Sequence, residues 1–172
     1  MNKLVATMWN AIEKVLKFIV YKLLRLKIRE SSWDGLIQFV KFGIVGLTNT
    51  VIGYLIYAIS LKILRAVHLF PTVDYFIAQL VMFLLSVLWS FYWNNKMVFK
   101  QEDGEKRNIM VALLKTYLTY AFTSLFLSEV LLLLWVNILG MSEYIAPIIN
   151  LLITVPLNFV IQKFWAFKKC GD

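Results

Sequence analysis

The sequence predicts an all-α integral membrane protein, with four transmembrane helices arranged as two repeated helical hairpins and preceded by an N-terminal amphipathic interfacial helix. Its 172 residues are 60% hydrophobic with a mean hydropathy of +0.73, which is more apolar surface than a soluble domain of this size buries. The apolar residues also form runs long enough to cross a bilayer as helices. Two of these runs are similar to each other, which indicates a duplication.

The similarity joins residues 78–100 to residues 146–168, at an offset of 68 residues without a gap. The identical pairs are Ala78 and Ala146, Leu84 and Leu152, Val87 and Val155, Phe91 and Phe159, Phe99 and Phe167, and Lys100 and Lys168. Because membrane segments use few residue types, some identities between two of them arise by chance. Because both segments also end in an amide, an aromatic residue and a lysine, duplication of one hairpin is the better interpretation.

The N-terminal region has the pattern of a basic amphipathic helix. Residues 2–29 place leucine, isoleucine and methionine on one helical face and lysines on the other, so the helix is expected to lie in the membrane interface. A cytosolic helix docked on a partner is the alternative. Ser31, Ser32 and Asp34 predict a break and an N-cap before the next helix. Residues 1–34 are therefore assigned to a membrane-surface helix.

The transmembrane domain is predicted over residues 36–169, with repeat one at about 36–100 and repeat two at about 109–168. The expected helices begin near residues 36 to 39, 73, 109 and 143, and they end near residues 64, 97, 138 and 167. Lys and Arg number eight from Lys3 through Lys41, two at Lys62 and Arg65, five from Lys96 through Lys115, none over residues 139–142, and three from Lys163 onward. By the positive-inside rule, both termini and the middle loop are predicted to be cytoplasmic.

Several function classes are disfavoured. The sequence has no phosphate-binding loop, no dinucleotide-binding glycine motif and no metal-spaced cysteine or histidine cluster, since His68 and Cys170 are single. We therefore expect no catalysis, no metal and no cofactor. The net charge of +8 comes from basic residues between and at the ends of apolar runs, where they meet anionic lipid headgroups rather than nucleic acid.

Polar residues within the spans are the candidates for function. Gly46, Asn49, Thr50 and Gly53 fall on one helical stripe, where the glycines are typical of close helix packing. Asn49 fits an interhelical hydrogen bond and contact with a polar ligand equally well. Glu129 is an intramembrane carboxylate, and counting from the helix ends places it at the level of Asn150 and Gln79. Its role is either functional or that of a neutral acid bridging two helices.

Amides and lysines gather at the cytoplasmic ends of the second and fourth spans. Asn94 and Asn158 lie there with Lys96, Lys100 and Lys163, among several tryptophans. This combination suits a phosphate and a sugar ring. Lysines and tryptophans at helix ends are also typical membrane anchors, whereas an anchor does not require the amides.

Two motifs resemble the GtrA-like family of four-helix membrane proteins, over about residues 36–169. They are Phe39-Val40-Lys41-Phe42-Gly43-Ile44-Val45-Gly46 with Asn49-Thr50, and Asn94-Asn95-Lys96-Met97-Val98-Phe99-Lys100. The resemblance implies translocation of a polyprenyl-phosphate-linked sugar, such as an undecaprenyl phosphate sugar, across the bacterial cytoplasmic membrane. A separate membrane glycosyltransferase would then use it for cell-surface polysaccharide or teichoic acid glycosylation. The fourth span departs from the family pattern at Gln162 and Ala166.

In this flippase hypothesis the substrate-binding residues are Asn49, Asn94, Lys96, Phe99, Lys100, Glu129, Asn158 and Lys163. The amides and Glu129 would bind hydroxyl groups, and the lysines would bind the phosphate. One alternative is a proton-coupled exporter of small cations that uses Glu129, although the lysines would repel such a substrate. Another is a scaffold that anchors a glycosyltransferase. A homo-oligomer is compatible with each hypothesis.

Overall fold

The structure, a computed structural model, describes residue 9 and residues 12–23, 30–69, 71–100, 107–142 and 144–168. These residues are helical apart from turns and helix ends, and they contain no strand. Four helical segments are long and apolar enough to cross a membrane, namely Ser32–Ala66, Asp74–Val98, Ile109–Ile138 and Ala146–Ala166. The predicted class of multi-pass helical membrane protein is thereby confirmed. The chain divides into two compact units, Met1–Val40 and Lys41–Asp172.

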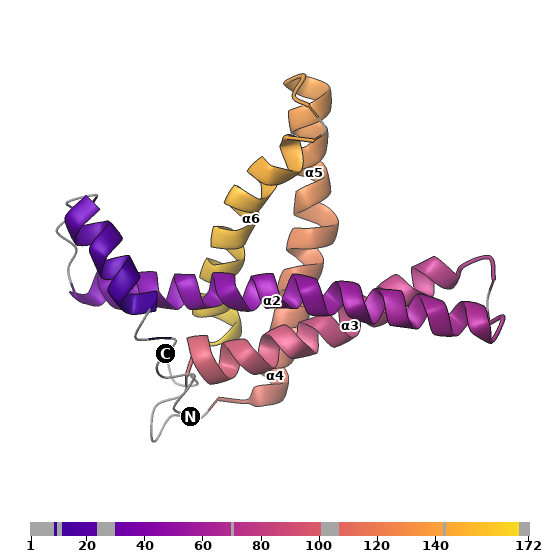
Figure 1. Cartoon of the computed structure of the whole chain (residues 1–172), viewed down its shortest axis with the longest axis horizontal. Helices are drawn as coiled ribbons and strands as arrows, with labels where there is room; N and C mark the ends of the chain where they lie inside the picture. The colour runs from indigo at the N-terminus through magenta and orange to yellow at the C-terminus, as the bar shows by residue number, and fades with distance from the viewer. Residues whose placement is uncertain are drawn as a thin grey trace. The chain divides into compact units, whose positions relative to one another are not determined.

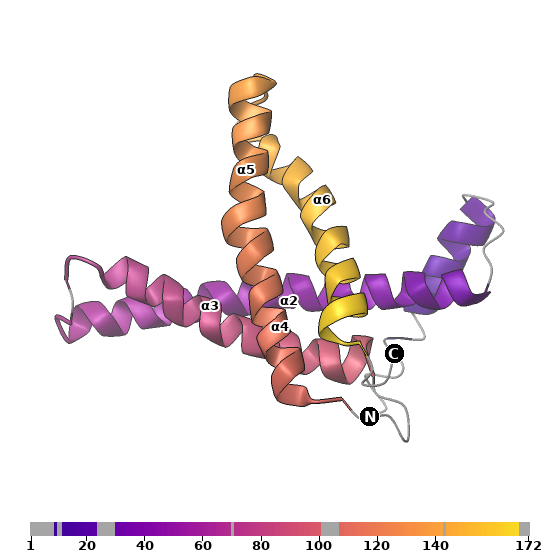
Figure 2. The same ribbon diagram turned by 180° about the vertical axis from the view of Figure 1, so that it is seen from behind.

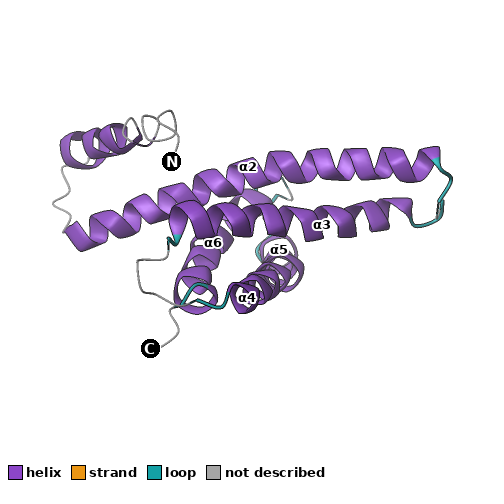
Figure 3. Cartoon of the chain, turned by 90° about the horizontal axis from the view of Figure 1, so that it is seen from below, coloured by secondary structure: helices purple, strands orange, loops and turns teal. Residues whose placement is uncertain are grey.

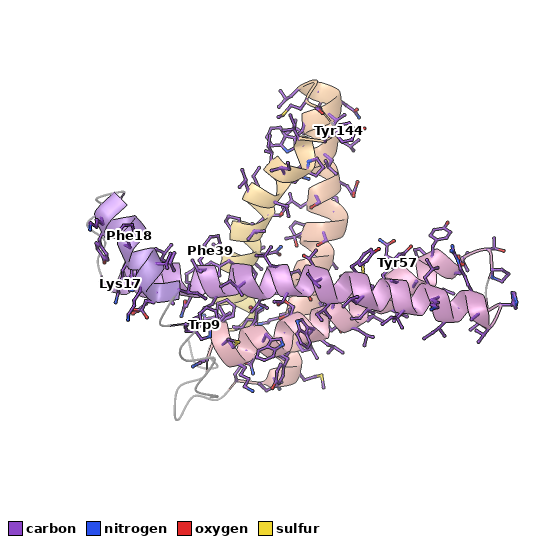
Figure 4. The ribbon with its side chains drawn as sticks, in the orientation of Figure 1. Trp9, Lys17, Phe18, Phe39, Tyr57 and Tyr144 are labelled. Carbon is purple, nitrogen blue, oxygen red and sulfur yellow. The ribbon has the colours of Figure 1, made fainter. Side chains whose placement is uncertain are left out.

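In the first unit, a helix packs against the start of α2 (Glu30–Ala66) through an aromatic contact. Residues 12–17 are helical and continue into the π-helix η1 (Phe18–Leu23). The Tyr21 and Trp33 ring centroids are 5.5 Å apart, and Lys17 Nζ lies 5.7 Å from the centroid of the Trp33 ring. Figure 4 labels Lys17 and Phe18 on this helix. More than half of the predicted amphipathic segment, residues 2–29, lies outside the described residues.

Lys17 also forms an ion pair with Glu13, one helical turn earlier, at 2.8 Å. The hydrogen bond that Lys17 donates to Glu13, together with the charge of that carboxylate, holds the pKa of Lys17 above its usual value. Because both side chains are exposed to about half of their area (52% and 41%), the pair contributes little to stability. The ion pair thus forms on the same helical turn that places the Lys17 ammonium over Trp33.

The predicted helix break at Ser31, Ser32 and Asp34 is wrong. Helix α2 begins at Glu30 and continues through these residues without interruption. These residues lie in the first turn of α2, where the backbone N–H groups have no intrahelical partner and a negative charge is favourable, so they are compatible with the helix. A cap signal ends a helix only when the backbone also turns there.

The second unit contains the rest of α2 and three further spans. The second span joins α3 (Asp74–Trp93) to the π-helix η2 (Asn94–Val98). The third runs through α4 (Ile109–Ala121), η3 (Phe122–Leu127), α5 (Ser128–Leu133) and η4 (Leu134–Ile138). The fourth joins α6 (Ala146–Ile161) to η5 (Gln162–Ala166). These bounds agree closely with the predicted spans.

Each pair of consecutive spans forms a hairpin. Figures 1 and 2 show α2 beside α3, and α4 with α5 beside α6. The first hairpin is closed at its turn by Arg65, whose Nε donates a hydrogen bond of 2.8 Å to Asp74 Oδ2. The second hairpin turns at Gly140, whose φ of +64° lies in the left-handed region that favours glycine.

The two hairpins meet at the ends of the second and fourth spans, around five buried phenylalanine rings. This phenylalanine cluster consists of Phe42, Phe91, Phe99, Phe159 and Phe167. Centroid distances are 5.5 Å for Phe91 and Phe167, 5.8 Å for Phe99 and Phe159, and 4.7 Å for Phe99 and Phe167. Figure 3 shows the ends of α3, α4 and α6 together at this junction. Most other large apolar side chains are exposed, as expected where lipid covers them.

A π turn precedes the cluster in each hairpin. The backbone N–H of Phe99 donates to Asn94 O, and that of Phe167 donates to Gln162 O, both at 2.8 Å. After these bonds the backbone leaves the helical conformation, at Phe99 and at Phe167. Each π turn thus ends a span and turns a phenylalanine ring into the junction.

We predict that Phe99→Ala destabilises the protein by about 3 kcal/mol or more, because it removes a ring that stacks on two others and leaves a cavity. The measurement is the midpoint of reversible unfolding by sodium dodecyl sulfate in mixed micelles. Phe164→Ala is the matched control, since this ring is 66% exposed. Equal midpoints for the two variants would contradict a structural role for the cluster.

Candidate functional site

A buried polar centre lies at the hairpin junction, next to the phenylalanine cluster. Asn94 Nδ2 donates to Ser90 Oγ at 3.1 Å and approaches Gln162 Oε1 at 3.5 Å. Ser90 Oγ and Tyr120 OH are 2.8 Å apart. Ser90, Asn94 and Gln162 have no exposed surface. These residues, with Tyr120, form what we term the amide centre, which joins α3, α4 and α6 with their π turns.

The amide centre has unused hydrogen-bonding capacity. Asn94 Oδ1 and Gln162 Nε2 are buried and have no hydrogen-bond partner within the described part of the chain. A buried polar atom without a partner costs about 1–3 kcal/mol, and hydrocarbon surroundings supply no water to offset it. The junction therefore presents one acceptor and one donor that a water molecule or a ligand hydroxyl group would satisfy.

A second buried polar contact lies on the third span. Thr123 Oγ1 is 2.8 Å from Asn158 Oδ1 and 2.9 Å from the carbonyl oxygen of Thr119. The threonine hydroxyl has one proton for these two acceptors. Thr116, Thr119 and Thr123 are all buried, and each hydroxyl contacts the carbonyl four residues earlier. This polar face was not predicted, although the spacing of three and then four residues in the sequence could have identified it.

Arg107 connects the two hairpins beside the phenylalanine cluster. Its Nη1 donates to Asn95 Oδ1 at 3.0 Å and to the carbonyl oxygen of Phe99 at 2.9 Å. The guanidinium carbon lies 5.2 Å from the centroid of the Phe167 ring. Arg107 thus holds the end of η2 against the start of the third span and against the cluster. It was not predicted as a site residue, because it stands in a polar loop that has no periodic spacing.

The lysines around the junction lie over aromatic rings. Lys96 Nζ donates to Tyr92 OH at 3.0 Å and is 5.7 Å from the Trp93 ring. Lys163 Nζ is 5.5 Å from the Phe159 ring, and Lys115 Nζ donates to the carbonyl oxygen of Trp165 at 3.2 Å. Rings hold these cations in place without neutralising them, so the charge stays available to an anion.

The predicted site residues do not all come together. Asn94, Phe99 and Asn158 are buried at the junction, Lys96 and Lys100 are exposed beside it, and Lys163 is half-buried. Asn49 lies elsewhere, in a groove between α2 and α3.

Glu129 is exposed on α5, and Gln79 is exposed on α3. Asn150 accepts from Trp135 Nε1 and donates to the carbonyl oxygen of Ser128, both at 2.9 Å. The amide of Asn150 thus has partners on the third span, and a functional role for Glu129 stays a prediction. Counting residues from helix ends set the depth of these side chains but left the rotation of each helix undetermined.

The amide centre and its surroundings lie within a region that known proteins share. The family described as "GtrA/DPMS, transmembrane domain" matches residues 41–167. No curated protein and no solved structure is significantly similar to the chain. The family match spans both hairpins, the amide centre and Arg107, and it agrees with the motif resemblance. The chain therefore belongs to the GtrA/DPMS transmembrane-domain family.

Proposed function

We propose that the protein moves a polyprenyl-phosphate-linked sugar from the cytoplasmic to the outer leaflet of a bacterial cytoplasmic membrane. A separate membrane glycosyltransferase would use this sugar there for cell-surface polysaccharide or teichoic acid glycosylation. The family is one of membrane proteins in glycosylation pathways that act with lipid-linked sugars. The observation that carries the proposal is the amide centre, with its unpaired acceptor and donor, next to exposed and half-buried cations.

The physical task is to carry a sugar phosphate through hydrocarbon. The prenyl chain stays in the bilayer throughout, whereas each sugar hydroxyl that loses water without a replacement partner costs several kcal/mol. The side-chain atoms Asn94 Oδ1 and Gln162 Nε2 offer such replacements at one site. Lys96, Lys100 and Lys163 would bind the phosphate, because an ammonium group binds phosphate as a point charge.

We further propose that the hairpins are internal repeats. An offset of 68 residues relates Asn94 to Gln162. The same offset relates Phe91 to Phe159 and Phe99 to Phe167, so the contact between Phe91 and Phe167 has its counterpart in the contact between Phe159 and Phe99. Both π turns obey this relation. Two similar halves around one junction are the architecture that transporters use to open a site to either side in turn.

The alternatives receive less support from the structure. Proton-coupled export requires a carboxylate in a wet cavity, and Glu129 is exposed on α5. A scaffold for a glycosyltransferase requires no buried hydrogen-bonding groups left unpaired at the junction. We therefore retain translocation as the proposed function.

We predict that Asn94→Ala slows translocation at least tenfold, which corresponds to the loss of about 1.4 kcal/mol of binding to the crossing headgroup. The measurement is a leaflet-resolved assay of a labelled prenyl-phosphate sugar in proteoliposomes. Asn137→Ala is the control, since Asn137 is exposed on η4. Equal rates for the two variants, at equal protein abundance, would reject the amide centre as the site.

A second variant separates the flippase from the exporter. Glu129→Gln removes a charge while keeping the shape of the side chain. We expect the rate of prenyl-phosphate sugar translocation to stay within about twofold of the unmodified rate. The reason is that substitutions of exposed polar residues away from a site change free energies by no more than about 0.5 kcal/mol. Loss of translocation in Glu129→Gln would assign Glu129 to the transport path. Growth resistance to quaternary ammonium compounds that depends on Glu129 would favour the exporter.

The proposed orientation is testable with the single cysteine. Cys170 is expected on the cytoplasmic side, so a membrane-impermeant maleimide should label it in inside-out vesicles and leave it unlabelled in intact spheroplasts. Tyr144, which is 83% exposed in the second hairpin turn, should show the reverse pattern as Tyr144→Cys in a Cys170→Ser background. Labelling of both positions from the same side would refute the topology.

A further inference from the structure

The helix of residues 12–23 carries lysines and apolar side chains together on one exposed side. Lys14, Val15, Phe18 and Lys22 are exposed, with accessible fractions of 58% for Val15 and 57% for Phe18. Successive steps of one, three and four residues place these four side chains on the same side of a helix. Lys22 Nζ lies 5.3 Å from the centroid of the Phe18 ring, as expected for neighbours on that side. We call these four residues the cationic face.

Another side of the same helix packs within the first unit. Val20 is buried, and so is Trp33 at the start of α2. The centroids of the Tyr21 and Trp33 rings are 5.5 Å apart, and Lys17, which is paired with Glu13, lies over Trp33. These contacts fix the rotation of the helix and leave the cationic face uncovered.

The family match does not account for the cationic face. The matched region begins at residue 41, so the function proposed for the hairpins assigns no task to residues 12–23. The chain nevertheless continues through α2 into the stretch between Lys41 and Lys62, which contains no charged residue and is long enough to cross the hydrocarbon layer. A bilayer surface is therefore always within reach of the face.

The charge of the helix favours an anionic surface. Residues 12–23 contain three lysines and one acidic residue. Because that residue, Glu13, pairs with Lys17, the charges of Lys14 and Lys22 are not balanced within the helix. A lysine beside an anionic lipid surface contributes about 1 kcal/mol, which is about fivefold in a docking equilibrium.

The apolar members of the face favour a lipid surface over an acidic protein. Exposed lysines attract either partner, whereas Val15 and Phe18 gain free energy only when they leave water. At a membrane interface, an aromatic ring enters the boundary between headgroups and acyl chains while lysine side chains extend back to the phosphates. An acidic protein would have to supply an apolar recess at the matching position, whereas every bilayer supplies this boundary.

We propose that the cationic face docks on the anionic phospholipids of the bilayer. Lys14 and Lys22 bind headgroup phosphates, and Phe18 enters the boundary with the acyl chains. The first unit thereby holds the start of α2 to a leaflet that is rich in anionic lipid. This docking goes beyond the translocation proposed above and does not depend on it.

The test places a fluorophore on the cationic face of the full chain. Val15→Cys in a Cys170→Ser background is labelled with a nitrobenzoxadiazole probe, whose fluorescence lifetime lengthens when the probe leaves water. In phosphatidylcholine nanodiscs the short lifetime should dominate, and phosphatidylglycerol should populate a long lifetime that a doxyl-labelled lipid quenches. Raising the salt concentration should reverse this change without any substitution, because salt screens charges at a surface.

Two double variants identify the groups responsible. Lys14→Gln with Lys22→Gln should lower the ratio of docked to undocked probe by about 25-fold, which is about fivefold for each lysine. Lys14→Arg with Lys22→Arg keeps both charges and should preserve the ratio within about twofold. Lys62→Gln, which removes an exposed lysine near the other end of α2, is the matched control and should leave the ratio unchanged.

Three results would overturn the proposal. The first is a lifetime distribution that is the same with and without phosphatidylglycerol. The second is a long lifetime that survives both the loss of the two lysines and high salt, which would make the docking purely apolar. The third is a response to prenyl phosphate or to polyglutamate that phosphatidylglycerol does not produce, which would assign the face to the translocated lipid or to an acidic protein.

Discussion

The pairing of amides and phenylalanine rings in one layer is the interaction on which the second unit depends. Helices in a bilayer gain little from burying apolar surface against each other, because lipid is as apolar as leucine. Close ring stacking and hydrogen bonds must therefore hold the hairpins together. The structure concentrates both at the junction, where Asn94 approaches Gln162 at 3.5 Å and Phe99 stacks on Phe167 at 4.7 Å. Elsewhere, large apolar side chains are mostly exposed.

The π turns bring these two kinds of contact together. A π turn inserts one residue into the helical repeat and rotates the residues that come after it about the helix axis. In each hairpin the residue at the start of the turn, Asn94 or Gln162, accepts through its backbone carbonyl the hydrogen bond from Phe99 or Phe167, after which the backbone leaves the helix. One local distortion thus brings a buried amide side chain and an aromatic ring to the same junction. Such distortions are frequent at functional sites, in keeping with the role proposed for the junction.

Features that a local sequence pattern determines could be predicted, and features that depend on tertiary packing could not. The spans were predictable, because the bilayer imposes a length of apolar helix that hydropathy records directly. The junction was predictable in part, since the repeated endings identified Asn94 and Phe99. The exposure of Glu129 on α5 was not, because a helix rotation of one residue changes the face on which a side chain lies. The contacts of Arg107 depend on tertiary packing, which leaves no periodic signal in a loop.

The unbroken course of α2 has a consequence for how much of the helix the bilayer accommodates. Its 37 residues correspond to about 55 Å of helix, far more than the hydrocarbon thickness of about 30 Å. Lys41 and Lys62 enclose a stretch without any charged residue, and about 31 Å of helix separates them. This stretch matches the hydrocarbon thickness by itself, so the eleven residues from Glu30 to Val40 are more helix than one crossing of the bilayer requires.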